Sequence, residues 1–314
     1  MATTSTLWYN GTTLRYLRTL GLAVALVTLA ACASASPSPA SSTPTKIAIG
    51  TTGGILVSAF GSVWTTDLAG DRLVRIDPGA ARVSGKVGLG QRPYGLAAGG
   101  GSVWVASQAA ETLARVNPQT LKVTKRIHVG FQAFAAAFGA RSVWVSLEGD
   151  GAVARVDPRK NRVVARIRGL TDPNGLVYTD HALWVSDRLG NRVVRVNPRT
   201  NRITARIRVP AADWITPGSG ALWVSSERNR VYRLDPRTRK VTGSVQVGAN
   251  PLASAWIGGE LWVPNIDSNT ISIVDPAHLA VSRTIPAGNA PLGVLSTAYG
   301  VFVSMSNDGA VWRF

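Results

Sequence analysis

Residues 93–130 read PYGLAAGGGSVWVASQAAETLARVNPQTLKVTKRIHVG. This stretch contains four short apolar runs, PYGLAA, SVWVA, TLARV and KVTKRIHV, which are rich in Val, Ile, Leu and aromatic residues. Each run has the length of a strand and is too short for a helix. The runs are separated by Gly99–Gly101 and Asn117-Pro118, which favour tight turns. The stretch therefore predicts a unit of four consecutive strands.

The same unit recurs along the chain. An aromatic residue preceded by an aliphatic one, here called the marker aromatic, returns every 39 or 40 residues, at Trp64, Trp104, Trp144, Trp184, Trp223, Trp262 and Phe302. Six of these are followed, about thirteen residues later, by Asp-Pro or Asn-Pro. No helical periodicity of useful length occurs after residue 45. Four strands per unit at this period predict an all-β fold, a seven-bladed β-propeller with four-stranded blades.

The ends of the repeated region support this count. The seventh copy ends at GAVWRF, residues 309–314, which is its third strand. The segment Lys46–Gly50 matches the fourth strand of other copies, such as Arg126–Gly130. We therefore expect an N-terminal strand to complete the last blade of a propeller domain at residues 46–314, which removes an exposed sheet edge.

Two residue types repeat in step with the blades. We expect the marker aromatic, which lies in the second strand of every blade, to fill the space between adjacent blades. The third strand carries an arginine in six blades and an isoleucine in the other one, at Arg75, Arg115, Arg155, Arg195, Arg233, Ile273 and Arg313. These arginines are expected to lie between blades or at their edges, because a feature copied around a ring is scaffold.

The first 45 residues indicate export. Residues 1–31 hold two arginines, no acidic residue and an apolar stretch from Leu20 to Ala31, as in a signal peptide. The stretch ends in Leu29-Ala30-Ala31-Cys32, which resembles the bacterial lipobox, and Cys32 is the only cysteine. We expect a diacyl anchor on Cys32, a Ser/Pro/Ala-rich tether at 32–45, and an extracytoplasmic protein attached to the bacterial cell membrane. Ordinary cleavage near Ala31, Ala33 or Ala35 would instead release it.

Charge is the next notable feature. The chain has 34 Lys and Arg against 17 Asp and Glu, a net charge of +17, which permits attraction to nucleic acid, anionic lipid or acidic wall polymers. Part of the excess falls on the outer strands and lower turns of blades three to five. This basic rim comprises Arg159, Lys160, Arg162, Arg199, Arg202, Arg237, Arg239 and Lys240. The rim lacks interleaved aromatic residues, so we expect a solvated, membrane-attracted surface rather than specific nucleic-acid binding.

The repeat G-L-A-x-G-x-G-S-V-W-V…L-x-R-V-(D/N)-P-x-T…I-x-V-G resembles two propeller families. One is the YVTN-repeat family of extracytoplasmic propellers, and the other is the virginiamycin B lyase, or streptogramin lyase, family. The resemblance covers residues 46–314 and rests on scaffold positions. The lyase resemblance implies elimination at a cyclic depsipeptide ester by histidines, a glutamate and a divalent metal at the central top face.

The histidines do not fit that set. His128 belongs to an outermost strand, while His181 and His278 belong to turns on the face opposite the usual ligand site. No histidine is left at the channel mouth to act as a base, and a Cys32 that is lipidated provides no thiol site. We therefore expect no catalytic residues, no metal and no cofactor. This expectation favours a protein that is not an enzyme.

Function in a propeller is expected where equivalent loop positions differ. The positions twelve and ten residues before each marker aromatic lie where the chain enters the innermost strand. Trp214, directly after one of these positions, is a large residue at a place that other blades mostly fill with Gly, Ala or Ile. The expected channel mouth gathers Arg92, Tyr94, Gln132, Phe134, Asp172, Asn174, Asp213, Trp214 and Asn250. Aromatic planes with polar groups of both signs suit a small polar ligand, a sugar or a peptide, although a hydrated mouth without a ligand is the alternative.

The sequence thus predicts a non-catalytic, monomeric binding module for a small polar ligand or a partner protein. The alternatives are a streptogramin-lyase-like enzyme and a binder of nucleic acid or another polyanion.

Overall fold

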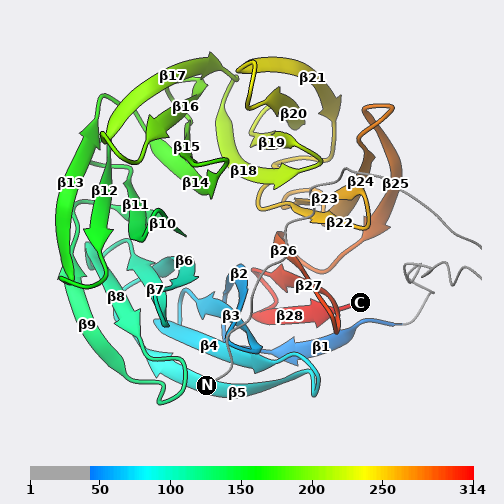
Figure 1. Cartoon of the computed structure of the whole chain (residues 1–314). Coiled ribbons are helices and arrows are strands. Elements are labelled where there is room, and N and C mark those ends of the chain that lie inside the picture. Colours follow the sequence, from blue (N-terminus) through cyan, green and yellow to red (C-terminus); the bar gives the residue numbers. More distant parts are fainter. Residues whose placement is uncertain (1–42) are drawn as a thin grey trace, which may run out of the picture. The chain divides into compact units, whose positions relative to one another are not determined.

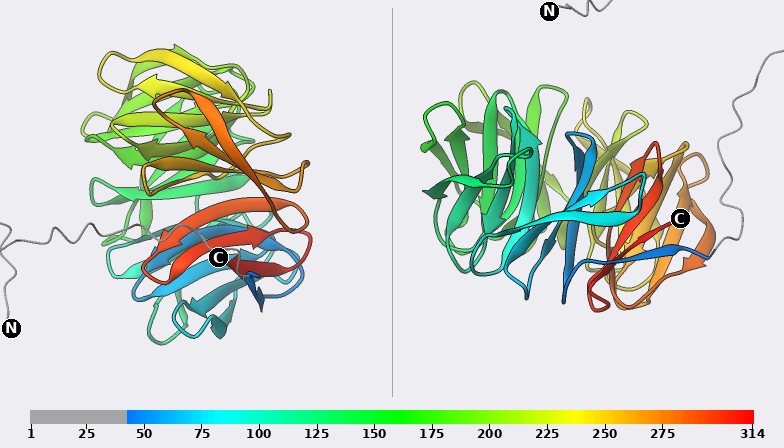
Figure 2. Two further views of the ribbon diagram at one scale, coloured as in Figure 1. Left: turned by 90° about the vertical axis from the view of Figure 1, so that its right-hand side faces the viewer. Right: turned by 90° about the horizontal axis from the view of Figure 1, so that it is seen from below.

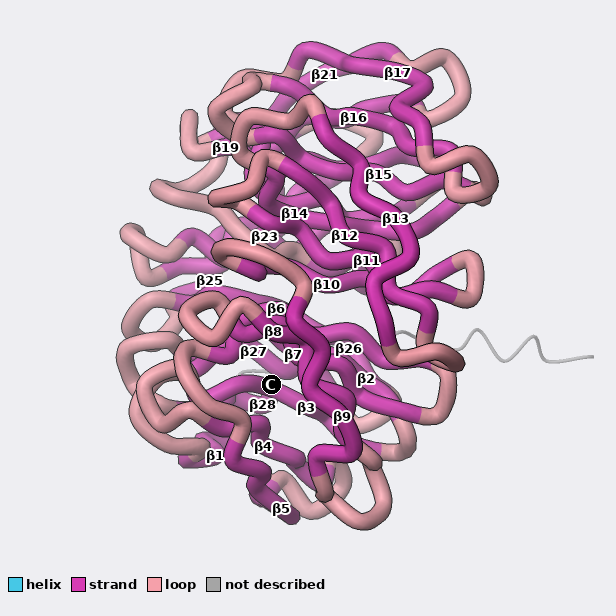
Figure 3. Tube along the Cα trace, turned by 90° about the vertical axis from the view of Figure 1, so that its left-hand side faces the viewer, coloured by secondary structure: helices cyan, strands magenta, loops and turns pink. Residues whose placement is uncertain are grey.

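The four apolar runs of each repeat pair into one antiparallel sheet, and the sheets stand side by side around an axis. The computed structural model describes residues 43–314, which form seven four-stranded sheets in a ring (Figure 1). Strands and loops alone make up this region (Figure 3), so no helix in residues 43–314 is available to cross a membrane. The predicted all-β, seven-bladed propeller with four-stranded blades is confirmed.

The innermost and second strands build the channel and the blade centres. The innermost strands are β2 (Gly53–Ala59), β6 (Pro93–Gly99), β10 (Ala133–Gly139), β14 (Pro173–Thr179), β18 (Ala212–Gly218), β22 (Ala255–Ile257) and β26 (Pro291–Thr297). The second strands are β3 (Ser62–Asp67), β7 (Ser102–Ser107), β11 (Ser142–Leu147), β15 (Ala182–Asp187), β19 (Ala221–Ser226), β23 (Glu260–Asn265) and β27 (Gly300–Met305). Each innermost strand packs against those of the two neighbouring blades.

The third and fourth strands form the outside of the ring. The third strands are β4 (Arg72–Asp77), β8 (Thr112–Val116), β12 (Ala152–Asp157), β16 (Arg192–Asn197), β20 (Arg230–Asp235), β24 (Thr270–Asp275) and β28 (Ala310–Arg313). The fourth strands are β5 (Arg82–Gly88), β9 (Val123–His128), β13 (Arg162–Arg168), β17 (Arg202–Arg208), β21 (Lys240–Gln246), β25 (Ala280–Pro286) and, from the other end of the chain, β1 (Thr45–Ala48). Blade 1 is β2–β5, and blades are numbered in chain order from it.

The last blade is completed as expected. β1 pairs antiparallel with β28 in the order β1-β28-β27-β26, with Ile47 opposite Val311 (Figure 2). Ile49 continues the contact by donating its backbone N–H to the Gly309 carbonyl at 2.9 Å. Ile47 and Ile49 are both buried, so burial of each contributes roughly 1.5–3 kcal/mol to the closure. The prediction that residues 46–50 close the ring is therefore confirmed.

The marker aromatics form the common core of the blades. All seven are buried, with at most 4% of their surface exposed, and each lies in a second strand. Four indoles donate their N–H to the carbonyl five residues earlier, as Trp144 does to Gly139 at 3.1 Å, and thereby tie the second strand to the end of the innermost one. Their expected structural role is confirmed.

Cys32 and the predicted signal peptide lie outside the described residues, as does most of the predicted tether. The structure therefore leaves those assignments as predictions.

Candidate functional site

One backbone hydrogen bond recurs in every blade and sets the geometry of the channel mouth. The residue twelve positions before the marker aromatic accepts, through its carbonyl, the N–H of the residue four positions after that aromatic. The seven pairs, donor first, are Leu68–Thr52, Gln108–Arg92, Glu148–Gln132, Arg188–Asp172, Glu227–Ala211, Ile266–Asn250 and Ser306–Ala290. Each blade thus presents two loops held together at the mouth, one entering its innermost strand and one leaving its second strand.

The position twelve before the marker aromatic is mainly a turn position. Five of its seven residues have φ between 44° and 57°, among them Arg92, Gln132 and Asn250. The Arg92 side chain is exposed and takes part in none of the ion pairs within residues 43–314, while its backbone N–H donates to Asp71 at 2.8 Å. The Asn250 side chain makes one hydrogen bond within residues 43–314, from its Nδ2 to Asp267 Oδ1 at 3.5 Å. These three predicted residues shape the rim of the mouth through their backbone.

The position ten before the marker aromatic points inward. Tyr94 and Phe134 stack with ring centroids 4.2 Å apart and an angle of 23° between planes. Asn174 and Asp213 follow in the next two blades and are 2% and 5% exposed. The predicted residues Tyr94, Phe134, Asn174 and Asp213 therefore occupy neighbouring blades on the channel side, and the polar pair is more deeply buried than the aromatic one.

Trp214 is half-buried and packs against two apolar clusters, one formed mainly by blades 1 and 2 and one by blades 3 and 4. The close approach of its strand explains Gly175, because a Cβ there would lie 2.6 Å from the Asp213 carbonyl oxygen and 3.0 Å from the Trp214 Cα. Trp214 thus contributes to packing inside the ring as well as offering an indole plane.

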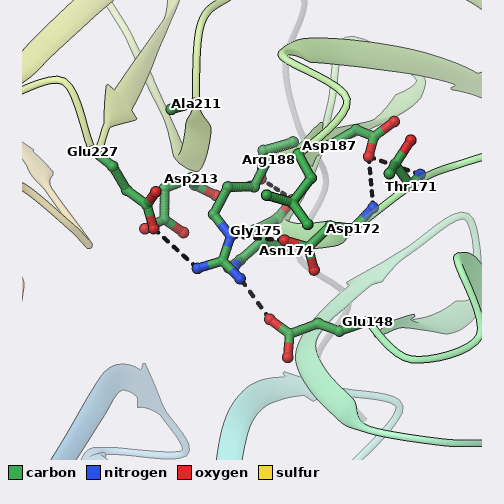
Figure 4. Close-up of polar contacts among 12 residues, drawn as sticks. Glu148, Thr171, Asp172, Asn174, Gly175, Asp187, Arg188, Ala211, Asp213 and Glu227 are labelled. Carbon is green, nitrogen blue, oxygen red and sulfur yellow. Dashed lines mark hydrogen bonds and ion pairs between the residues drawn. The ribbon is translucent and has the colours of Figure 1, made fainter.

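Arg188 is the centre of the polar side chains at the mouth (Figure 4). Its Nε donates to Asp172 Oδ2 at 2.7 Å, and its Nη1 donates to Glu227 Oε1 at 2.9 Å. Asp172 is the predicted residue that departs from the turn conformation, and its carboxylate is 8% exposed. One guanidinium therefore bridges carboxylates from blades 4 and 5.

Glu148 extends this network toward blades 2 and 3. Asn174 Nδ2 donates to its Oε1 at 3.2 Å, and Gln108 Nε2 donates to its Oε2 at 3.2 Å. Burial raises the pKa of Glu148 to about 7, and the neighbouring Asp172 carboxylate adds to the rise against the opposing influence of Arg188. Glu148 is therefore partly protonated near neutral pH.

Asp213 lies in an unfavourable environment for a negatively charged carboxylate. Its Oδ1 is buried and has no hydrogen-bond partner in residues 43–314. Burial raises its pKa to about 7, Arg188 opposes that rise, and the carboxylates of Glu227 and Glu148 reinforce it. Burial also raises the pKa of Tyr94, with Asp213 as the next cause. The aromatic pair and the carboxylates are thus close enough to form one site.

We call Glu148, Asp172, Asn174, Arg188, Asp213 and Glu227 the mouth cluster. Sequence reasoning missed Glu148, Arg188 and Glu227, together with Gln108, because it compared only the loops that enter the innermost strands. The missed residues all stand four positions after a marker aromatic. That position reads Leu68, Gln108, Glu148, Arg188, Glu227, Ile266 and Ser306, and its charged residues in blades 3–5 were a visible signal.

The mouth cluster does not match the metal and histidine set that the lyase resemblance implies. Within residues 43–314 no group of three or more His, Cys, Asp or Glu residues is placed to hold a metal ion. His181 and His278 lie in the β14–β15 and β24–β25 turns, and His128 ends β9. Asp172 and Glu227 are instead paired with Arg188, so a guanidinium stands where the carboxylates meet.

Comparison with known proteins supports the fold. No protein-family model matches the chain, and no curated protein sequence matches it. Two solved structures are similar. A structure of streptogramin B lyase has a TM-score of 0.76 at 14% identity and covers 86% of this chain and 96% of its own. The hydrazine synthase of Kuenenia stuttgartiensis has a TM-score of 0.69 at 16% identity, covering 81% and 92%. The chain therefore has a virginiamycin-lyase-like propeller fold, as expected from its repeat.

Proposed function

We propose that the propeller is a binding module whose mouth cluster holds a small ligand through a cationic, hydrogen-bond-donating group such as an ammonium. The observation that carries this proposal is the unpaired, buried Oδ1 of Asp213. A buried carboxylate oxygen without a donor is costly, and a ligand N–H or O–H removes that cost when it binds.

The balance of charge in the cluster favours a cation. Four carboxyl groups, of Glu148, Asp172, Asp213 and Glu227, surround the single guanidinium of Arg188. Asp172 and Glu227 already share that guanidinium, whereas Glu148 and Asp213 are the two whose pKa is raised to about 7. A bound cation would stabilise their ionised forms, so binding should release protons near neutral pH.

The aromatic pair adds a second recognition element. Tyr94 and Phe134 present stacked rings beside the carboxylates. Ring faces attract ammonium groups, and the attraction grows when the cation is desolvated. Carboxylates with neighbouring aromatic rings therefore fit an amine-bearing ligand better than a purely anionic one.

A titration of wild type and Asp213→Asn with a panel of small amines and amino sugars tests the proposal. We expect at least one amine to bind, with Asp213→Asn weakening it at least about tenfold, because the variant loses a charged acceptor. The matched control is Asp267→Asn, which changes an exposed acid of the same face outside the cluster. Equal binding by wild type and Asp213→Asn would contradict the proposal.

A streptogramin-lyase-like or other acid–base enzyme is the second candidate, and the pKa values near 7 are the observation that favours it. A general base works best when its pKa lies near the operating pH. A further variant, Glu148→Gln, separates the two functions, since in an enzyme it would retain binding and lose turnover. Binding without chemical change of the ligand would favour the module.

We further propose that the module is monomeric and acts outside the cytoplasm, anchored through a lipid on Cys32. The support for export and anchoring is the sequence pattern of residues 1–45. Cys32→Ser should move the protein from the membrane fraction to the soluble one and abolish lipid labelling. The exposed basic rim would then add a weak attraction to anionic headgroups, which vesicle binding at varied salt concentration would measure.

A further inference from the structure

The third-strand arginines join neighbouring blades through one repeated contact. In five cases a guanidinium donates to the carbonyl of the proline that follows the third strand of the next blade. These pairs are Arg75–Pro118 at 3.2 Å, Arg115–Pro158 at 3.0 Å, Arg155–Pro198 at 2.7 Å, Arg233–Pro276 at 3.5 Å and Arg313–Pro78 at 3.1 Å. We call this contact the blade latch. It confirms the expected inter-blade role of these arginines.

The boundary between blades 4 and 5 is different. Arg195 donates to Thr204 of its own blade at 3.0 Å, and no hydrogen bond joins it to Pro236. At the two preceding boundaries the latch includes a second acceptor, the amide oxygen of Asn161 or Asn201, at 3.0 and 2.9 Å. The equivalent residue in blade 5 is Arg239, which has no acceptor and carries the same charge as Arg195. The open latch therefore coincides with a second guanidinium at the position of the asparagine acceptor.

A cavity of about 420 Å³ lies at the open latch. It is lined by Asp180, Trp184, Arg195, Pro236, Arg237 and Arg239. Its volume is in the range of small-molecule sites. Three guanidinium groups against one carboxylate give its lining a net positive charge, and none of the ion pairs within residues 43–314 uses these groups.

The indole of Trp184 also differs at this boundary. Trp184 is fully buried behind the cavity, and its Nε1 has no hydrogen-bond partner in the described part of the chain. The equivalent indoles of Trp64, Trp104, Trp144 and Trp223 each donate to the backbone carbonyl five residues earlier. Blade 4 therefore lacks both the latch and this indole hydrogen bond, while the cavity beside it gathers three cationic donors.

We propose that this cavity is a binding site for a small oxyanion, the phosphate or carboxylate group of a small molecule. Arg195, Arg237 and Arg239 supply planar donors that match such groups, and their charges are already gathered before the ligand arrives. The partly exposed ring of Pro236 would contact the rest of the molecule. This site lies between blades at the lower turns and is separate from the mouth cluster.

Calorimetric titration with inorganic phosphate and with citrate, each at fixed ionic strength, tests the site. Arg239→Asn restores the acceptor found at the two preceding boundaries, so it should close the latch onto Pro236 and weaken anion binding at least about tenfold. Arg237→Ala should weaken binding without restoring the latch. The matched control is Arg199→Asn, an exposed arginine of the equivalent turn one blade earlier, which should bind as wild type does. The tighter of the two anions identifies the ligand class.

Two outcomes would overturn the proposal. One is that neither anion binds the wild type. The other is that Arg239→Asn, Arg237→Ala and Arg199→Asn all bind as wild type does or weaken equally, because that pattern reports diffuse attraction to a basic surface. Failure here leaves the function proposed for the mouth cluster untouched, since the two sites share no residue.

Discussion

The mouth of the propeller has two halves with the same backbone and different chemistry. In blades 2–5 the position four after the marker aromatic carries Gln108, Glu148, Arg188 and Glu227, while in blades 6, 7 and 1 it carries Ile266, Ser306 and Leu68. The position ten before the marker changes in parallel, from Tyr94, Phe134, Asn174 and Asp213 to Leu252, Leu292 and Gly54. All seven blades nevertheless form the same hydrogen bond between the two loops.

This difference separates scaffold from function. Since the backbone contact is made in every blade, the polar residues of blades 2–5 are not needed to hold the loops together. Asp213 even has a cost, because burial raises its pKa and leaves one oxygen unpaired. Polar groups that oppose stability in one half of a symmetric ring support the ligand site that we propose there.

The largest expected effect comes from breaking the scaffold that both halves share. Trp144→Ala in the polar half and Phe302→Ala in the apolar half should each lower the free energy of unfolding by about 3–5 kcal/mol, because both side chains are fully buried. Urea denaturation measures both. Trp214→Ala should cost less, since Trp214 is only half-buried. If Trp214→Ala is as damaging as Trp144→Ala, Trp214 is a core residue and ceases to be a ligand contact.

The pH dependence of stability should come from the polar half. The pKa of Asp213 is raised from 3.8 to about 7 and that of Glu148 from 4.5 to about 7, so the folded state binds more protons than the unfolded state between those values. The contribution to stability is therefore complete below pH 3.8 for Asp213 and below pH 4.5 for Glu148, and it is lost as the pH rises from there to about 7. Asp213 alone should account for roughly 2–4 kcal/mol of the fall.

Urea denaturation from pH 4.5 to 8 checks this. Asp213→Asn should flatten the profile and be more stable than wild type at pH 8, whereas Leu252→Asn, at the equivalent position of blade 6, should leave the slope unchanged. A slope that Asp213→Asn does not alter would mean that Asp213 is not protonated in the folded protein.

A smaller effect is expected from removing the central cation. Arg188→Met leaves the buried Asp172 carboxylate without its ion pair and should cost about 1–3 kcal/mol at pH 7. The substitution should also raise the pKa of Asp213 further, because Arg188 lowers it in the wild type. The free energy of unfolding should then depend more steeply on pH. Thermal and urea denaturation at two pH values measure both changes. An unchanged stability would show that solvent already screens the cluster.

The smallest effect is expected at Arg92. Its side chain is exposed and makes no ion pair within residues 43–314, so Arg92→Met should change the free energy of unfolding by less than about 0.5 kcal/mol. The same variant should bind an amine ligand as wild type does. A loss of binding would show that Arg92 is a ligand residue.

Much of the fold was predictable because it is periodic. The spacing of the marker aromatics predicted seven blades. The match of Lys46–Gly50 to a fourth strand predicted that β1 would pair with β28. The repeat also indicated which loops enter the innermost strands. The repeat placed Asp172, Asn174, Asp213, Tyr94 and Phe134 at the channel mouth, where the structure has them.

The rest of the site depends on contacts between loops that the repeat does not encode. Arg188 was missed although it joins Asp172 to Glu227, because the distance between a guanidinium and two carboxylates in neighbouring blades is set by lateral packing. Arg92 was included because it departs from the consensus, yet its left-handed φ of 52° shows a turn role. Departure from a repeat identifies variable positions, but not where their side chains point.

The pairing of β1 with β28 has a consequence for the order of folding. Ile47 and Val311 come from opposite ends of the propeller sequence, so their contact has the largest entropy of loop closure in the molecule. Blades built from neighbouring strands can form as the chain emerges, whereas β1 is made first and has no partner until β28, the last strand, has been made. During that interval β1 is an unpaired strand, which favours pairing with another chain. Folding of this protein therefore includes a stage at which closure of the ring competes with association between chains, and that competition is decided at the few residues of β1.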